Sequence, residues 1–280
     1  MLKRTFIITT LILAGCASSQ TAKANPEKFE PASAEVAAYT QVDDSGLKTW
    51  VTGFKQRAAQ KGISAKTLSA LDNLFVNEKV VKLDRSQPEH KQTMEQYLAN
   101  VINDARIKKG KQLMRENKKL LTELSSAFQV EPEYIVALWG LETSYGKNTG
   151  GFGVVNSLAT LAYEGRRKEF FENELINALK IIDAGHVSAA NMRGSWAGAM
   201  GQNQFMPSSF NAYAIDYNND GKKDIWATRE DVLASIANYL FTEGWSPAKK
   251  DKEKTLMHWN RSKYFVASVF KLAEEIKHEE

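Results

Sequence analysis

Apolar residues recur at helical spacing along most of the chain, beginning near Trp50. The spacing of three and four positions is clearest in the segments 113–124, 233–241 and 266–276, where it is typical of helices with one buried face. We find no convincing run of alternating apolar and polar positions and no internal repeat. The pattern therefore predicts a mainly α fold.

Glycines are unevenly distributed, with ten of the 17 lying between Gly140 and Gly201. Glycine permits positive backbone φ angles and the close approach of another group, which is why it is frequent in tight turns and ligand clefts. We therefore expect tight turns in this window, arranged as they often are around a ligand cleft.

The N-terminus is typical of an exported protein. Two basic residues precede the apolar segment 5–13, which is too short to span a bilayer. The segment 13–16, which ends at Cys16, resembles the lipobox of bacterial lipoproteins, in which the cysteine is lipidated and becomes the first residue. A buried structural cysteine is the alternative. Residues 1–15 are thus expected to be a lipoprotein signal peptide.

Residues 16–45 are rich in small, polar and charged residues and have little apolar periodicity. This composition favours a flexible tether between a lipidated Cys16 and a folded domain at 46–280. Ala17, rather than aspartate, after the cysteine resembles the pattern that sorts lipoproteins to the outer membrane. We expect the protein to be lipid-anchored at the periplasmic face of the outer membrane.

Composition narrows the function classes without identifying one. Apolar residues make up 43% and charged residues 25%, as in ordinary globular proteins. The 37 basic and 33 acidic residues leave a formal net charge of +4, and Lys3 and Arg4 belong to the expected signal peptide. So small an excess predicts no nucleic-acid partner. A single cysteine excludes a disulfide within the chain and a cysteine-cluster metal site.

A candidate general acid lies in the segment 131–142. Pro132 suits the first turn of a helix, and Ile135, Leu138 and Glu142 follow at helical spacing. Glu142 is thus predicted on the apolar side of that helix. Apolar surroundings raise the pKa of a carboxyl group, as a general acid near neutral pH requires. The alternative is a partly buried structural glutamate bonded to a nearby hydroxyl or arginine.

A second segment, 194–209, combines three glycines with neutral polar side chains at Ser195, Gln202, Asn203 and Gln204. Neutral hydrogen-bonding groups beside aromatic rings suit a sugar better than a phosphate, which calls for lysine or arginine. A tightly packed corner between a helix and a loop is the alternative.

The segment 216–224 resembles the start of an EF-hand calcium loop, with oxygen-bearing side chains at positions 1, 3, 5 and 9 and Gly221 at position 6. Ala227 replaces the usual glutamate at position 12, so Glu230 or Asp231 would have to close the site. The candidate ligands of a structural Ca²⁺ are Asp216, Asn218, Asp220, Asp224 and Asp231. A turn without metal is the alternative.

Together these segments resemble the membrane-bound lytic murein transglycosylase B family. The matching stretches are LDRSQPE at 83–89, ALWGLET at 137–143 with Tyr145-Gly146, SLATL at 157–161 with Arg166-Arg167, the segment 194–209, DGKKDIW at 220–226 and ASIANY at 234–239. The resemblance implies a lysozyme-like helical domain with an N-terminal helical subdomain and an EF-hand-like loop. It makes 46–280 a catalytic domain.

Residue by residue, the resemblance implies that Glu142 is the single catalytic acid. It implies substrate-binding roles for Ser195, Gln204, Tyr239, Asn260, Phe170 and Tyr264. Two cleft tyrosines of the family are replaced: one falls on Phe170, which keeps a ring without a hydroxyl, and one on Phe265, with Tyr264 adjacent.

The family cleaves the β-1,4 bond between N-acetylmuramic acid and N-acetylglucosamine in peptidoglycan, and the resemblance implies this lytic transglycosylase activity here. One carboxyl suffices because the substrate's acetamido group assists and its C6 hydroxyl attacks C1, leaving a 1,6-anhydro end. Glu164, Glu169 and Glu172 lie among arginines and are interpreted as structural. Catalysis should need no cofactor, and the expected partners are peptidoglycan glycan strands and, through the lipid anchor, a membrane.

Two other functions stay open. A hydrolytic muramidase would need a second carboxylate or a held water molecule. A catalytically silent, peptidoglycan-binding outer-membrane lipoprotein would have no need for Glu142 within its complete local motif.

Overall fold

The computed structural model describes residue 43 and residues 45–86 and 92–277. The predicted signal peptide 1–15, Cys16 and nearly all of the predicted tether lie outside the described residues. The described part of the chain consists of helices and one pair of two-residue strands, which confirms the mainly α prediction. Within that part, none of the helices has the length and apolar character needed to cross a membrane.

Most of the helices are joined by short connections. In chain order the elements are α1 (Leu47–Gln60), α2 (Ala65–Leu68), η1 (Ser69–Leu71), α3 (Glu78–Arg85), α4 (Met94–Val101), α5 (Asp104–Glu116), α6 (Lys118–Phe128), α7 (Pro132–Thr143), β1 (Phe152–Gly153), α8 (Val154–Glu164), α9 (Lys168–Asp183), β2 (Arg193–Gly194), α10 (Pro207–Tyr213), α11 (Arg229–Thr242), α12 (Lys249–Trp259) and α13 (Lys263–Lys277). Several begin where a side chain accepts an otherwise unpaired backbone N–H, as Ser64, Asn77 and Asn103 do at α2, α3 and α5.

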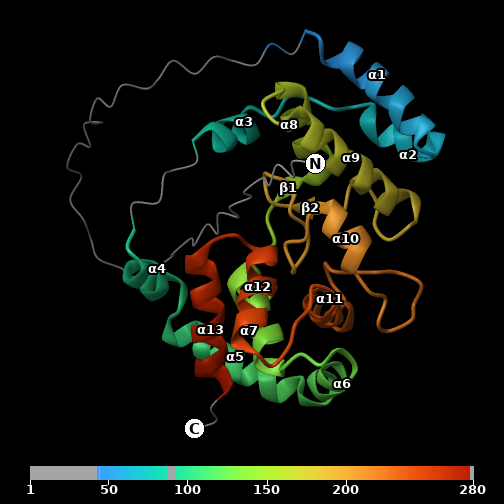
Figure 1. Cartoon of the computed structure of the whole chain (residues 1–280). Coiled ribbons are helices and arrows are strands. Elements are labelled where there is room, and N and C mark those ends of the chain that lie inside the picture. The colour runs from blue at the N-terminus through green and yellow to red at the C-terminus, as the bar shows by residue number, and fades with distance from the viewer. Residues whose placement is uncertain (1–42, 44, 87–91, 278–280) are drawn as a thin grey trace, which may run out of the picture.

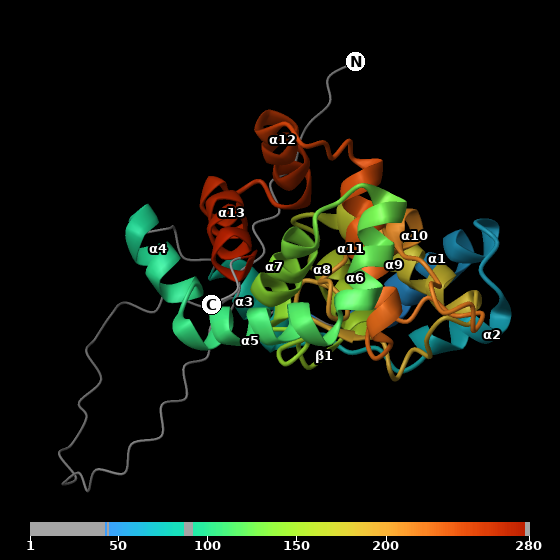
Figure 2. The ribbon, with the colours of Figure 1, turned by 90° about the horizontal axis from the view of Figure 1, so that it is seen from below.

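Helix α7 is the centre of the fold. It packs against α5, α6, α11 and α13, and in Figure 1 and Figure 2 it lies between α13 and α11. Pro132 occupies its first turn, as predicted, and every residue from Ile135 to Thr143 is buried. The spacing predicted one apolar face, but neighbouring helices cover α7 on all sides. A helix buried all round is apolar all round, so Glu142 stands out as a polar residue in its last turn.

Helices α8 and α9 form a second packing unit beside α7. They lie along each other, with α2 and α10 against α9 and α3 against α8, as Figure 1 shows. Trp50 of α1 donates its indole N–H to Glu172 of α9 at 3.2 Å, and Arg57 forms an ion pair with the same carboxylate at 2.8 Å. Glu172 therefore has the structural role predicted for it.

The glycine-rich window forms tight turns around the antiparallel pair of β1 and β2. A Cβ atom at Gly194 would lie 2.1 Å from the carbonyl oxygen of Ala199, so no other residue fits there. Gly201 has a φ of +62°, and a Cβ atom on it would lie 2.6 Å from the carbonyl oxygen of Ile225. The tight turns predicted for this window are confirmed.

Candidate active site

Glu142 lies in the last turn of α7, where the helix stops abruptly. Ser144 and Tyr145 both adopt left-handed backbone conformations, with φ of 51° and 62°, and turn the chain away from the helix axis. Only 6% of Glu142 is exposed. The predicted burial of this carboxyl is confirmed.

The two carboxyl oxygens of Glu142 have different surroundings. Oε1 accepts a hydrogen bond of 2.7 Å from the indole Nε1–H of Trp259. Oε2 is buried and has no hydrogen-bond partner. Burial raises the pKa of Glu142 to about 8, and the bond from Trp259 opposes this rise. The carboxyl is therefore mostly protonated at neutral pH, as a general acid must be.

Aromatic rings hold Trp259 beside the carboxyl. The ring centre of Trp259 lies 4.6 Å from that of Tyr239 and 5.4 Å from that of Phe205. Tyr239 in turn packs against Tyr213, with ring centres 4.4 Å apart. Since Tyr239 comes from α11 and Trp259 from the end of α12, the site is assembled from helices distant in sequence.

The glycine-rich segment is docked directly onto the end of α7. The hydroxyl of Thr143 donates to the backbone oxygen of Gln202 at 2.9 Å. The side chain of Gln202 accepts the indole N–H of Trp139 at 2.8 Å and donates to the backbone oxygen of Trp226 at 2.9 Å. These bonds fix the segment next to Glu142, so its polar residues are positioned by α7.

The two polar residues predicted to bind substrate in this segment also stabilise its turns. The Ser195 hydroxyl accepts the backbone N–H of Ala199 at 3.0 Å. The Gln204 amide donates to the backbone oxygens of Thr149 and Gly201 at 3.2 and 3.0 Å. Both residues are half-buried, and both keep hydrogen-bonding capacity beyond these bonds.

The remaining predicted substrate residues lie at different distances from this centre. Asn260 follows Trp259 and is buried, and its side-chain oxygen accepts the backbone N–H of Ser262 at 3.0 Å. The ring of Tyr264 packs against that of Tyr97, with centres 5.6 Å apart. Phe170 instead packs against Phe171 on α9, at 5.0 Å.

Two residues of the site were missed by the sequence reasoning. Burial raises the pKa of Tyr97, and the charge of Glu142 raises it further, so this phenol on α4 lies close to the carboxyl. Trp259 holds the carboxyl itself. Its position directly before Asn260 is a usable signal, whereas nothing in the spacing of Tyr97 points to the site.

The predicted calcium segment is a compact turn. The backbone N–H of Asp220 donates to Asp216 and to Asn218, both at 3.1 Å, and the N–H of Gly221 donates to Asp216 at 2.8 Å. Gly221 has a φ of +89°, as the sharp turn of an EF-hand loop requires. Three predicted ligands, Asp216, Asn218 and Asp220, therefore lie together.

The other two predicted ligands are engaged by the backbone. Asp231, fully buried, accepts the N–H groups of Tyr217 and Asp224 at 2.8 and 2.7 Å. Asp224 accepts those of Trp226 and Ala227. Across the described ranges, no three His, Cys, Asp or Glu side chains are grouped to hold a metal ion. The oxygen donors suit Ca²⁺ by type, but the five are not assembled into one cage.

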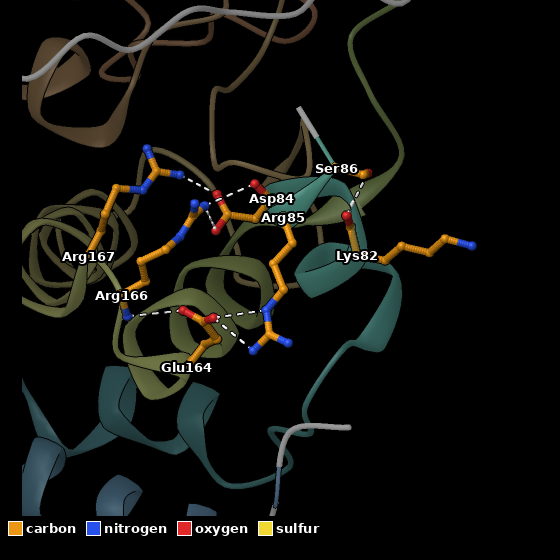
Figure 3. Close-up of polar contacts among 7 residues, drawn as sticks. All are labelled: Lys82, Asp84, Arg85, Ser86, Glu164, Arg166 and Arg167. Atoms are coloured by element: carbon orange, nitrogen blue, oxygen red, sulfur yellow. Dashed lines mark hydrogen bonds and ion pairs between the residues drawn. The ribbon is translucent and has the colours of Figure 1, made fainter. Parts of the chain in front are cut away.

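Another buried carboxylate, Asp84, joins two of the sequence motifs. Figure 3 shows the guanidinium groups of Arg166 and Arg167 directed at its two oxygens, and Arg166 also donates to the Asp84 backbone oxygen at 2.9 Å. In the same view Arg85 pairs with Glu164 at 3.0 Å. The cluster fastens α3 to the turn between α8 and α9, so Glu164 is structural, as predicted.

Comparison with known proteins places this geometry in context. The sequence model of the transglycosylase SLT domain family matches residues 46–253. Membrane-bound lytic murein transglycosylase B of Escherichia coli is 31% identical over 195 residues, which cover 69% of this chain and 54% of that protein. The chain thus spans about half the length of that relative.

Solved structures are similar along most of the chain. SltB3 of Pseudomonas aeruginosa, in complex with NAG-anhNAM-pentapeptide, is 31% identical with a TM-score of 0.79, covering 83% of this chain and 80% of that one. The lytic transglycosylase Slt35 of Escherichia coli, in complex with calcium, is 22% identical with a TM-score of 0.73, covering 81% and 92%. The second likeness concerns the fold alone.

Proposed function

Since the chain belongs to the transglycosylase SLT domain family, we propose that it is a lytic transglycosylase that cleaves the β-1,4 bond between N-acetylmuramic acid and N-acetylglucosamine in peptidoglycan. The observation that carries the proposal is the state of Glu142, a buried carboxyl whose pKa of about 8 keeps it protonated at neutral pH. Only burial and the Trp259 bond shift this pKa, and no neighbouring carboxylate contributes among the described residues. Such a site suits chemistry with one acid.

Glu142 acts twice in the proposed reaction. It first gives its proton to the oxygen between the sugars as the bond from C1 to that oxygen breaks, while the 2-acetamido oxygen of N-acetylmuramic acid stabilises C1. The resulting carboxylate then takes the proton of the C6 hydroxyl, whose oxygen bonds to C1. The product carries a 1,6-anhydro ring, no water is consumed, and Glu142 is protonated again. SltB3 has been solved in complex with NAG-anhNAM-pentapeptide. The anhydro sugar in that ligand supports the same route for the present chain.

The substrate would be held by the polar and aromatic residues around this carboxyl. Ser195, Gln204, Tyr239 and Asn260 lie on segments that contact Trp259 or the end of α7, and their neutral groups suit sugar hydroxyls and acetamido groups. Tyr264 reaches the same centre through Tyr97, and Phe170 would meet a more distant part of the glycan from α9.

Digestion of purified sacculi with the enzyme, followed by mass spectrometry of the released muropeptides, tests the function. The proposed route gives disaccharide products one water lighter than hydrolysis does. Products that have gained water would indicate a hydrolytic muramidase. Binding to sacculi without any release would indicate a silent binding lipoprotein.

For location, the proposal is a lipid anchor on Cys16 after removal of residues 1–15, a tether to about residue 45 and a catalytic domain at 46–280 at the periplasmic face of the outer membrane. The relative from Escherichia coli is named as membrane-bound, which supports it. We expect Cys16→Ala to move the protein from the membrane to the soluble periplasmic fraction with its specific activity kept, because residues 17–45 are expected to supply only a tether. Sedimentation of this variant with the outer membrane would contradict the anchor.

We also propose that the loop at 216–224 takes one Ca²⁺ through Asp216, Asn218 and Asp220, with Asp224 and Asp231 supporting it. The ion would stabilise the loop without entering the chemistry. Thermal melts in millimolar calcium and in chelator should then give a higher Tm with calcium for the wild type but not for Asp220→Ala. A wild-type Tm that is the same with calcium and with chelator would show that the loop is a turn without bound metal.

A further inference from the structure

The bond between Trp259 and Glu142 is directional. An indole N–H can donate a hydrogen bond but cannot accept one, so Glu142 Oε1 must be the acceptor in both protonation states of the carboxyl. Oε2 is buried and has no partner. A protonated carboxyl in this setting carries its hydrogen on Oε2, because a hydrogen on Oε1 would compete with the indole for the same region.

We propose that Trp259 is the positioning residue of the catalytic acid: its N–H holds Oε1 and leaves Oε2 as the oxygen that carries the transferable proton. The use of that proton rests on the proposed function, whereas the placement of the proton does not. Trp259 is itself fixed by the rings of Tyr239 and Phe205, at 4.6 and 5.4 Å. The carboxyl therefore has one fixed oxygen and one active oxygen.

This arrangement suits both halves of the reaction. In the first half the Oε2–H proton moves to the bridging oxygen, which keeps the electron pair of its bond to C1 and supplies the acceptor that Oε2–H lacks in the free protein. Between the halves Glu142 is ionised, and the Trp259 N–H stabilises its charge through Oε1. In the second half Oε2 takes the C6 hydroxyl proton as the oxygen of that hydroxyl bonds to C1.

The chain contains a matched pair outside the site. Trp245 donates its indole N–H to Oε2 of Glu131 at 2.8 Å, a bond almost equal in length to that of Trp259. Burial raises the pKa of Glu131, but the bonds from Lys252 and Trp245 outweigh it, so this pKa lies below its ordinary value. Each indole N–H thus donates to a glutamate, but the pKa of Glu142 is raised and that of Glu131 is lowered.

A first test needs only the wild-type protein. The NMR signal of an indole N–H moves when the carboxylate that it contacts is protonated. We expect the Trp259 signal to move with a midpoint near the Glu142 pKa of about 8, and the Trp245 signal to move only below the ordinary glutamate range. Among the described residues, Tyr97 on α4 is a titratable group whose pKa responds to the charge of Glu142, and its raised pKa keeps it neutral over this range. A Trp259 signal that does not move over the pH range in which Glu142 titrates would overturn the proposal.

The second test compares Trp259→Phe with Trp245→Phe, each of which keeps an aromatic ring and removes one N–H. Loss of the Trp259 bond should raise the Glu142 midpoint, read from its ¹³C carboxyl signal, by about one pH unit. The alkaline limb of kcat should move up by the same amount, with kcat about 10-fold lower and KM little changed. Trp245→Phe should change neither the Glu142 midpoint nor kcat.

An unchanged Glu142 midpoint in folded Trp259→Phe would refute the positioning role. A shifted midpoint in a protein that cleaves no glycan, even as wild type, would leave the positioning role standing and refute the proposed function instead.

Discussion

Glu142 and Asp84 are two carboxyl groups buried to a similar degree, 6% and 2% exposed, in opposite surroundings. Asp84 meets two guanidinium groups and lies between helices that it fastens together, as in Figure 3. Glu142 meets one indole N–H and no cation among its described neighbours. A buried carboxylate that forms ion pairs holds neighbouring helices together. A buried carboxyl without ion pairs keeps its proton and can donate it. Burial alone therefore does not identify a catalytic carboxyl, but its partners do.

The largest expected effect that separates the two groups is on turnover. Glu142→Gln should lower the rate of sacculus digestion by about 10²-fold or more, because the amide can neither give nor take the proton. Its Tm should not fall, since the variant replaces a neutral buried acid with a neutral amide. Glu133→Gln is the matched control, because Glu133 is a buried glutamate of the same helix that pairs with Lys277 at 3.0 Å. Activity of Glu142→Gln within a few-fold of wild type would place the acid elsewhere.

Asp84→Asn should show the reverse pattern. It leaves Arg166 and Arg167 without their anion and should destabilise the fold by about 2 to 3 kcal/mol, less than for a fully buried pair because Arg166 is half exposed. Urea melts should show this as a lower midpoint with an unchanged slope. At a temperature where the variant is folded, kcat should stay within a few-fold of wild type. A large loss of kcat without loss of stability would show that Asp84 is not a purely structural carboxylate.

A third expected effect is a pH dependence of stability. Folded Glu142 keeps its proton up to about pH 8, whereas the unfolded chain releases it near the ordinary value of 4.5. Between these values the folded state binds more protons, so Glu142 lowers stability as the pH rises. The Tm of the wild type minus that of Glu142→Gln should thus decrease from pH 5 to pH 8.5. A difference that is constant over this range would mean that the carboxyl is ionised when folded.

The sequence predicted the parts of the site that depend on local pattern. Pro132 and the spacing to Glu142 define α7 and the burial of its acid because both follow from one helix. The complete covering of α7 could not be predicted, since it depends on how α5, α11 and α13 pack. The partner of Glu142 could not be predicted either, because α12 brings Trp259 to it from a distant part of the chain.

The corner at Asp84 shows the same limit in another form. Both of its motifs, LDRSQPE and Arg166-Arg167, can be recognised in the sequence, yet nothing in either indicates that they bind each other. Each is short and charged, which is equally typical of a solvated surface. Contact between them follows only from the packing of α3 on α8.

Glu142 and Trp259 are 117 positions apart, and α13, which packs along α7, comes later still. The surroundings that hold Glu142 are therefore complete only once α12 and α13 are in place. The last two helices thus complete the buried environment in which the pKa of this carboxyl is raised. Because the N-terminus is made first, this environment can form only after nearly the whole chain has been made.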